Sequence, residues 1–294
     1  MQLESNVIGR VIAGVTVCAA LVLFVGAAAA GSSGKATRAT DGRSGQLGLM
    51  HPVRTFGPSS RGYQKVGSSN WSGYAQHTTA KGTFTAVEGT WTVPKVDTSK
   101  SGSQYAADWV GIGGYSEDTL VQAGTLEWNA DGTAKYEAWT EILPAALIRI
   151  SGLSIHPGDQ IKTTVVETST NVWAMTVDDL TSGHSGGRTV TYKSRGESAE
   201  AIHERPEVNS GLATLATTSN VTFDPDNFST SAPGSPVWKP LLKAISGAKL
   251  AEIFMTNNEG TAIIASPSAP SANDKGFTVA DGSKAPPPPT RPTR

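Results

Sequence analysis

The residues of this chain that are able to support hydrolytic chemistry are carboxylates and amides on strand-like segments, placed among tryptophans. Glu137, Trp139 and Glu141 alternate along one such segment, so all three point to the same face of a strand. Two carboxyl groups beside an aromatic ring are found in glycosidases, but residues four apart on a strand have Cα atoms about 13 Å apart, too far for that acid pair. Acids from different strands could still converge, so a carbohydrate-directed sandwich stays an alternative.

Other catalytic patterns in the sequence are incomplete. Residues 183–187 fit the G-x-S-x-G pattern, but a strand-like stretch follows where a nucleophile elbow needs a helix, so a glycine-rich hairpin is expected. His203-Glu204 begins like a zinc-binding H-E-x-x-H motif, but the second histidine is missing and Pro206 would break the helix. The other histidines occur singly. The sequence therefore predicts no metal and no cofactor.

The composition excludes several protein classes. The 294 residues carry 17% charged side chains, a formal net charge of -1 and a single cysteine. These values exclude an extended coiled coil, a disulfide framework and a nucleic-acid binder driven by net positive charge. Many glycines, prolines and hydroxyl residues favour a β-rich fold with many turns.

Short apolar or β-branched runs recur along the chain, separated by turn residues, and predict an antiparallel β-sandwich or barrel. The Asp131-Gly132 pair between two runs predicts a hairpin turn, and only Leu241–Ile245 is compatible with a helix. The predicted strands are Asn70–Thr78, Thr83–Val93, Ala106–Ile112, Thr119–Trp128, Lys135–Ile142, Leu147–Ile155, Gln160–Glu167, Val172–Asp178, Arg188–Lys193, Val221–Phe223 and Leu250–Met255.

The two ends of the chain differ from its middle. Residues 1–30 have a charged start, an apolar run and a closing Ala-x-Ala, which predicts a cleaved signal peptide and secretion; an uncleaved membrane anchor is the alternative. Residues 268–294 are rich in Ser, Pro and Ala and are expected to form a disordered tail. The folded domain is therefore expected over 67–267.

A charge difference separates the leader, 31–66, from this domain. The leader has six Lys and Arg against one Asp, whereas 67–267 has 13 Lys and Arg against 21 Asp and Glu. Opposite charges attract at neutral pH, and the attraction weakens as carboxylates become protonated. We therefore expect a pro-segment that is released in acid near residue 67; an ordinary basic linker is the alternative.

Six motifs follow one another in an order that identifies a family resemblance. They are Ser69–Tyr74 (SNWSGY), Gly89–Pro94 (GTWTVP), Asp108–Gly114 (DWVGIGG), Leu120–Thr125 (LVQAGT), Tyr136–Glu141 (YEAWTE) and Ala199–Pro206 (AEAIHERP). Over about 70–223, and more loosely to 267, the chain resembles the glutamic peptidases, the eqolisin or G1 family. The resemblance implies a sandwich of two packed, curved antiparallel sheets and an acid-active endopeptidase. The chain lacks the disulfides of the fungal relatives, and in this respect it resembles the bacterial branch of the family.

The resemblance places the family's catalytic glutamine at Gln122 and its catalytic glutamate at Glu204. A carboxylate can act as a base toward water and, once protonated, as an acid toward the leaving amine. A primary amide has two N–H donors for the water and the developing oxyanion. From the residues alone, Gln122 could also be a buried structural glutamine, and Glu204 an exposed partner of Arg205 or Lys193.

The same resemblance assigns Trp109, Trp139 and Glu141 to the substrate groove and makes Glu200 a neighbouring acid without a catalytic role. The expected partners are protein or peptide substrates and the chain's own leader, with no nucleic acid, and a monomer is expected.

Four residues depart from the family pattern. Gly113 stands where many members have an aspartate that braces the site, and Thr140, Ile142 and Leu143 replace aromatic residues. We expect these differences to alter the support of the site and its pocket preference.

Overall fold

The computed structural model describes residues 36–38, 45–229 and 233–290, and this part of the chain contains strands and turns but no helix. Leu241–Ile245, the stretch whose sequence was compatible with a helix, does not form one. This stretch forms turns directly after Pro240, and Leu241 and Leu242 are fully buried in the core. Five residues are too few to form a stable helix on their own, so tertiary burial decides the local conformation.

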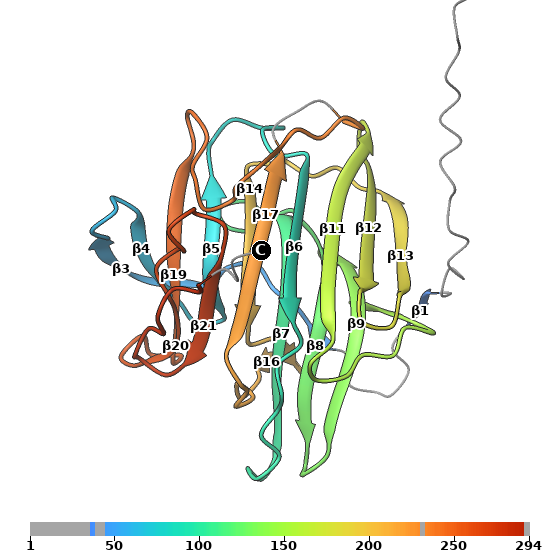
Figure 1. Ribbon diagram of the computed structural model, residues 1–294, viewed down its shortest axis with the longest axis vertical. Helices are drawn as coiled ribbons and strands as arrows, with labels where there is room; N and C mark the ends of the chain where they lie inside the picture. Colours follow the sequence, from blue (N-terminus) through green and yellow to red (C-terminus); the bar gives the residue numbers. More distant parts are fainter. Residues whose placement is uncertain (1–35, 39–44, 230–232, 291–294) are drawn as a thin grey trace, which may run out of the picture. The chain divides into compact units, whose positions relative to one another are not determined.

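Most strands form the two packed layers of a β-sandwich, as expected (Figure 1), whereas β2 (Gly45–Gln46), β15 (Glu207–Val208) and β16 (Gly211–Leu212) form a separate three-stranded sheet. Every neighbouring pair in the first layer is antiparallel. In order across the layer, the strands are β13 (His184–Thr191), β12 (Val172–Asp179), β11 (Gln160–Ser169), β6 (Ala86–Thr92), β17 (Val221–Ser229), β21 (Phe277–Asp281) and β20 (Ile263–Pro267), with the short β18 (Trp238–Lys239) beside β17.

The second layer carries the motifs expected to form the site. Its strands, in order, are β1 (Ala36–Arg38), β10 (Ile148–Ile150), β9 (Ala134–Ile142), β8 (Leu120–Ala130), β7 (Ser103–Gly113), β14 (Ser198–Glu204), β5 (Trp71–His77), β19 (Lys249–Thr256), β4 (Gln64–Ser68) and β3 (Pro52–Pro58). The pair β19–β4 is parallel and the other neighbours are antiparallel. The pairing of β19 with β20 joins the two layers along one edge.

Each strand of the second layer has two different faces. On β7, Val110 and Ile112 point into the main core between the layers, whereas Ala107 and Trp109 belong to a second cluster on the opposite face. This alternation follows from the two-residue period of a strand. Nearly all of β7, β8 and β14 is buried, because one face packs on the first layer and chain segments cover the other.

The predicted hairpin at Asp131-Gly132 is confirmed, since both residues have positive φ angles, 52° and 92°, as a type I′ turn requires. The glycine-rich 183–187 stretch leads into strand β13, so no nucleophile elbow forms there. Strand β14 was not predicted, because its alternating alanines and charged residues lack the apolar or aromatic enrichment of a typical strand.

The ends of the folded part differ from the predicted boundaries. Strand β3 and most of β4 lie inside the predicted leader, 31–66, and β21 lies inside the predicted disordered tail, 268–294. The disorder prediction is wrong for β21 because Phe277 and Val279 are buried in the main core. The predicted signal peptide, 1–30, lies outside the described residues.

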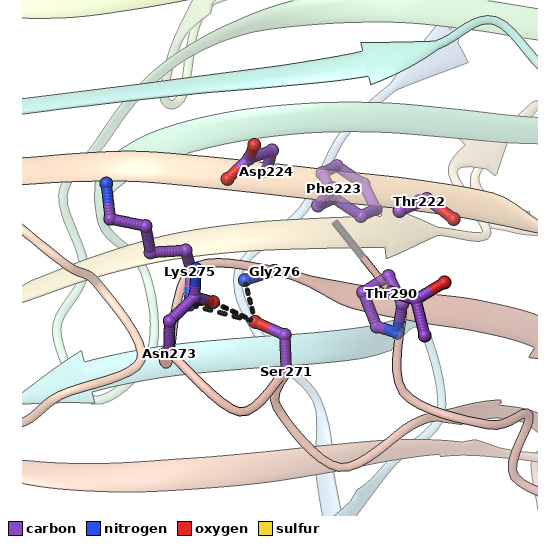
Figure 2. Close-up of a pocket in the computed structure, with 9 residues that line it drawn as sticks. Thr222, Phe223, Asp224, Ser271, Asn273, Lys275, Gly276 and Thr290 are labelled. Carbon is purple, nitrogen blue, oxygen red and sulfur yellow. Dashed lines mark hydrogen bonds between the residues drawn. The ribbon is translucent and has the colours of Figure 1, made fainter. Parts of the chain in front are cut away.

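The end of the described chain packs on the first layer. Pro289 and Thr290 close a cavity of about 120 Å³ over Phe223 and Gly276 (Figure 2). A Cβ at position 276 would lie 3.0 Å from the backbone oxygen of Phe223, so a larger residue there would require a small shift of that backbone. This cavity belongs to the layer that does not carry Gln122 and Glu204.

Candidate active site

Gln122 and Glu141 face each other on β8 and β9. The register pairs the two residues directly, and Gln122 Nε2 donates a hydrogen bond of 2.9 Å to Glu141 Oε2. Both side chains are fully buried, and Gln122 Oε1 has no hydrogen-bond partner among the described residues. Glu141 therefore fixes the orientation of the amide and leaves part of its hydrogen-bonding capacity for another group.

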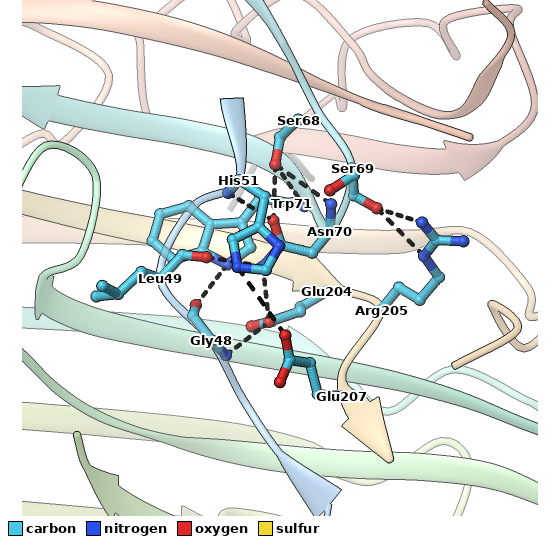
Figure 3. Close-up of polar contacts among 10 residues, drawn as sticks. All are labelled: Gly48, Leu49, His51, Ser68, Ser69, Asn70, Trp71, Glu204, Arg205 and Glu207. Carbon is cyan, nitrogen blue, oxygen red and sulfur yellow. Dashed lines mark hydrogen bonds and ion pairs between the residues drawn. The ribbon is translucent and has the colours of Figure 1, made fainter. Parts of the chain in front are cut away.

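Glu204, at the end of β14, is held through both carboxylate oxygens. Trp109 Nε1 donates to Oε2 at 2.9 Å, and Asn70 Nδ2 donates to Oε1 at 3.2 Å. The alternative ion pair with Arg205 does not form, because that guanidinium donates to the Ser69 carbonyl and to Asn258 (Figure 3). The Gly48 amide, described below, is a third neutral donor to this carboxylate, and no cation of the described residues forms an ion pair with it.

The surroundings shift the proton affinity of both carboxyl groups. Burial raises the pKa of Glu204 to about 8, although hydrogen bonds from the Gly48 amide, Asn70 and Trp109 oppose the shift. Burial also raises the pKa of Glu141 well above its usual range, and the charge of Glu204 adds to that effect. The two carboxyl groups are therefore close enough to influence each other's ionisation, and such perturbed acids are typical of functional sites.

A segment of the predicted leader lies across these groups. We call residues 45–51 the strap. The Leu47 amide donates to Glu141 Oε2 at 3.2 Å, and the next amide, of Gly48, donates to Glu204 Oε1 at 3.0 Å. Consecutive residues of one peptide thus reach the Gln122–Glu141 pair and Glu204. The side chains of Gln122 and Glu204 do not hydrogen-bond to each other directly.

The rest of the strap is also bound through its main chain. Trp71 Nε1 donates to the Gly48 carbonyl at 3.1 Å, and Asn70 Nδ2 donates to the Leu49 carbonyl at 3.0 Å. Figure 3 shows how Asn70, Trp71 and Glu204 surround this stretch. Main-chain recognition of this kind is independent of sequence, so the face that binds the strap is suited to extended peptides in general.

The side chain of Leu47 fills an apolar pocket. It is 1% exposed and belongs to the cluster that contains Trp71, Trp109 and Trp139. Trp109 and Trp139, the tryptophans predicted for the substrate groove, both belong to this cluster, and Trp109 also donates to Glu204. Asn70 and Trp71 received no role from the sequence, although the motif that contains them pointed to this region.

Glu200 lies in the row of the sheet that contains Gln122, and Gly113 lies two residues beyond Gly111 on β7. Glu200 is in register with Gly111, which is in register with Gln122, and neither carboxyl oxygen of Glu200 has a hydrogen-bond partner in the described chain. Burial and the charge of Glu117 raise its pKa well above the usual range. At Gly113, where φ is +97°, a Cβ would lie 2.1 Å from the Thr119 oxygen, so no aspartate fits without rearrangement.

The described residues contain no group of three or more His, Cys, Asp or Glu side chains arranged to bind a metal ion. Among the same residues, no helix is long and apolar enough to span a membrane.

A model of the Peptidase A4 family matches residues 69–280, more than half of the chain. The chain belongs to this family. Aspergillopepsin-2 from Aspergillus niger, which is 34% identical over 179 residues, aligns with 53% of this chain and 62% of its own length. Scytalidopepsin B from Scytalidium lignicola is 34% identical over 130 residues, 44% of this chain and 46% of its own length. The chain thus spans less than two thirds of either curated relative.

The fold of the family is also found in solved structures. The crystal structure of scytalido-glutamic peptidase with a transition state analog inhibitor superposes with a TM-score of 0.58 at 24% identity, covering 72% of this chain and 98% of that chain. This similarity confirms the sandwich. The motif resemblance to the glutamic peptidases is confirmed by the family match.

Proposed function

We propose that this protein is an acid-active endopeptidase in which Glu204 activates water and Gln122 stabilises the oxyanion. The observation that carries the proposal is the strap. A peptide of the chain itself lies in the groove, with consecutive amides bonded to Glu204 and to Glu141, the partner of Gln122. A face that binds a main chain at these side chains can present a substrate peptide bond to them.

The chemistry follows from the three groups. With the strap absent, ionised Glu204 removes a proton from a water molecule, whose oxygen attacks the carbonyl carbon of the substrate. The negative charge that forms on the carbonyl oxygen is stabilised by the Gln122 amide, while Glu141 holds that amide in place. As the C–N bond breaks, protonated Glu204 gives its proton to the departing amine. No covalent intermediate is needed.

An acidic working range follows from the acids around this centre. Glu204 must be ionised at the start of the reaction. Its burial under the strap opposes ionisation, whereas exposure to water after the strap has left would permit it. Glu141 and Glu200 are buried carboxyl groups with raised pKa values, so they stay protonated as the pH falls and do not add charge beside the oxyanion.

The strap makes the full chain an inhibited form of this enzyme. Its Gly48 amide donates to the Glu204 oxygen that would otherwise accept a proton from water, and the Leu47 side chain fills the apolar pocket. Secretion through the predicted signal peptide, a monomeric state and protein or peptide substrates belong to the same proposal.

A protein-substrate assay at pH 3–5 tests the catalytic assignment. We expect Gln122→Ala and Glu204→Gln each to lose at least about 100-fold in kcat, the scale of losing an oxyanion donor or a general base. Gln160→Ala and Glu88→Gln, on the first layer, are matched controls and should retain activity. Full activity in either site variant would falsify the assignment, and cleavage of polysaccharide instead of protein would favour a carbohydrate-directed function.

A further inference from the structure

A buried ion pair lies directly behind the catalytic residues, on the core side of the second layer. His203 Nδ1 and Asp108 Oδ1 are 2.8 Å apart, and the two side chains are 2% and 0% exposed. The register of β14 and β7 pairs the two residues directly, so their side chains share one face. Neither side chain belongs to the groove.

Each member of the pair is adjacent in sequence to a residue of the site. His203 precedes Glu204 on β14, and Asp108 precedes Trp109 on β7. Those two neighbours point to the opposite face, where Trp109 Nε1 donates to Glu204 Oε2 at 2.9 Å. In addition to their backbone ladder, the same two strands are therefore connected by side chains on both faces, by the ion pair on the core side and by the Trp109–Glu204 bond on the groove side.

The charges around the pair favour its ionised form. Burial acts to lower the pKa of His203, but the charge and hydrogen bond of Asp108 outweigh it and leave the pKa raised. Burial, and then the charge of Asp108, raises the pKa of Glu127 on β8, which faces the pair and thus stays protonated. Asp281 on β21 is the other acid near His203, and burial raises its pKa. The protonated imidazole and Asp108 therefore balance each other.

We propose that His203 and Asp108 are positioning residues that hold Glu204 and Trp109 in the placement needed for catalysis. A charge-assisted hydrogen bond is short and directional, so it restricts sliding and rotation of β14 against β7. A displacement of about 1 Å of a reacting group can reduce a rate about 100-fold. The expected effect on the reaction rate rests on the proposed function, whereas the expected effect on the placement of Glu204 and Trp109 does not.

The decisive variant is the apolar double substitution Asp108→Leu/His203→Leu, with kcat and KM measured after the strap has been removed by cleavage and Tm measured on the full chain. Replacing a buried ion pair by apolar residues often leaves stability unchanged or raised. We expect an unchanged or higher Tm together with a kcat about 10- to 100-fold lower and a KM within about twofold. A role in stability alone predicts that activity follows Tm, so this variant separates the two roles.

Two further variants complete the experiment. Asp108→Asn/His203→Gln can keep a hydrogen bond at the same positions and should regain most of the lost kcat. Asp118→Asn/His156→Gln makes the same change of residue types at exposed positions and should behave like wild type. Wild-type kcat in the apolar double variant, or kcat falling in step with Tm in all variants, overturns the proposal.

A readout independent of catalysis is the indole N–H resonance of Trp109, assigned through Trp109→Phe. We expect it to shift or broaden in the apolar double variant and to return in the hydrogen-bonding one. An unchanged resonance in the apolar variant also overturns the proposal. If the wild-type chain cleaves no protein at any pH, the proposed function fails while this measurement still decides whether the pair positions Trp109.

Discussion

Two parts of the basic leader are attached to the rest of the chain in different ways. The strap, 45–51, is bonded to the side chains of Glu141, Glu204, Asn70 and Trp71. Its backbone pairing is short and scattered: β2 pairs with β15, the Met50 amide donates to the Gly114 carbonyl, and the Ser69 amide donates to the His51 carbonyl. The following hairpin, 52–68, comprises β3 and β4 and is joined to β19 by a parallel backbone ladder. Contacts to side chains and short backbone pairings can be replaced by those of another peptide, whereas the continuous ladder from Gln64 to Ser68 makes β4 part of the sheet.

The hairpin is also anchored by its side chains. Val66 is 6% exposed, and the Phe56 ring meets Phe254 edge to face at 5.6 Å between centroids. Lys65 forms an ion pair with Glu252 at 3.7 Å. A cut near residue 67, as the charge pattern suggested, would remove these contacts. We therefore expect activation to separate the strap from the hairpin, with the cut before Pro52.

The largest effect should come from removing the strap altogether. A chain that begins at Pro52 is expected to be active without a lag, with at least about 100-fold more initial activity than the full chain, because a tethered inhibitor acts at a high effective concentration. A chain that begins at residue 67 should be less stable, since β3 and most of β4 are gone. Initial rates and thermal unfolding of both chains measure this difference, and equal rates for the Pro52 chain and the full chain would contradict inhibition by the strap.

The next effect concerns pH. Burial raises the pKa of the strap-covered Glu204 from 4.5 to about 8, whereas the hydrogen bond from the Gly48 amide of the strap acts in the opposite direction. We expect the burial to dominate, so that covering Glu204 is linked to proton uptake. The contribution of this group to strap binding is complete below about pH 4.5 and is lost as the pH rises through 8. A synthetic peptide of residues 45–51 should thus inhibit the Pro52 chain more strongly at pH 5 than at pH 8, by at most about tenfold per pH unit.

The attraction between the basic leader and the acidic domain predicts the opposite trend. Measuring the inhibition constant with the strap peptide and with a longer peptide, 31–51, at both pH values separates the two effects. Weaker inhibition by the short peptide at pH 5 would show that acid loosens the strap. The expected result means that acid does not expel the strap and that its removal needs cleavage.

A smaller effect should distinguish the hairpin from the strap. Val66→Ala should lower the free energy of unfolding by about 2 kcal/mol, because two buried methyl groups are lost, and should leave inhibition intact. Leu47→Ala should instead weaken the inhibition, so that the basal activity of the full chain rises while its Tm changes little. Chemical denaturation and initial rates of the two variants check this, and the same response from both would show that the leader acts as one unit.

The smallest effect is expected at Gly48. A Cβ there would lie 3.7 Å from Asn70 Nδ2 and 4.0 Å from Glu204 Oε1, which is ordinary contact. The inhibition constant of a Gly48→Ala strap peptide should therefore stay within about threefold of the unchanged peptide's value. Gly48→Pro removes the amide donor to Glu204, so it should weaken the inhibition more. Inhibition constants of the variant strap peptides measure both. Equal losses in the two variants would show that the amide does not matter.

Much of the fold could be predicted from residue patterns. The runs of β-branched and aromatic residues located most strands of both layers, and Asp131-Gly132 located a hairpin turn, because alternation and turn chemistry are local properties. Strand β14 was missed since its alternating alanines and charged residues lack apolar or aromatic enrichment, although it carries Glu204. The bacterial branch stays a prediction.

The sequence alone determined which residue types were available and in what order: the motifs named the family and singled out Gln122, Glu204, Trp109, Trp139 and Glu141. Only the tertiary structure decided which other groups of the chain contact these residues. The strap, the donors Asn70 and Trp71, and the His203–Asp108 pair all depend on contacts between segments far apart in the chain. Such contacts arise from strand register and layer packing, which no local spacing encodes.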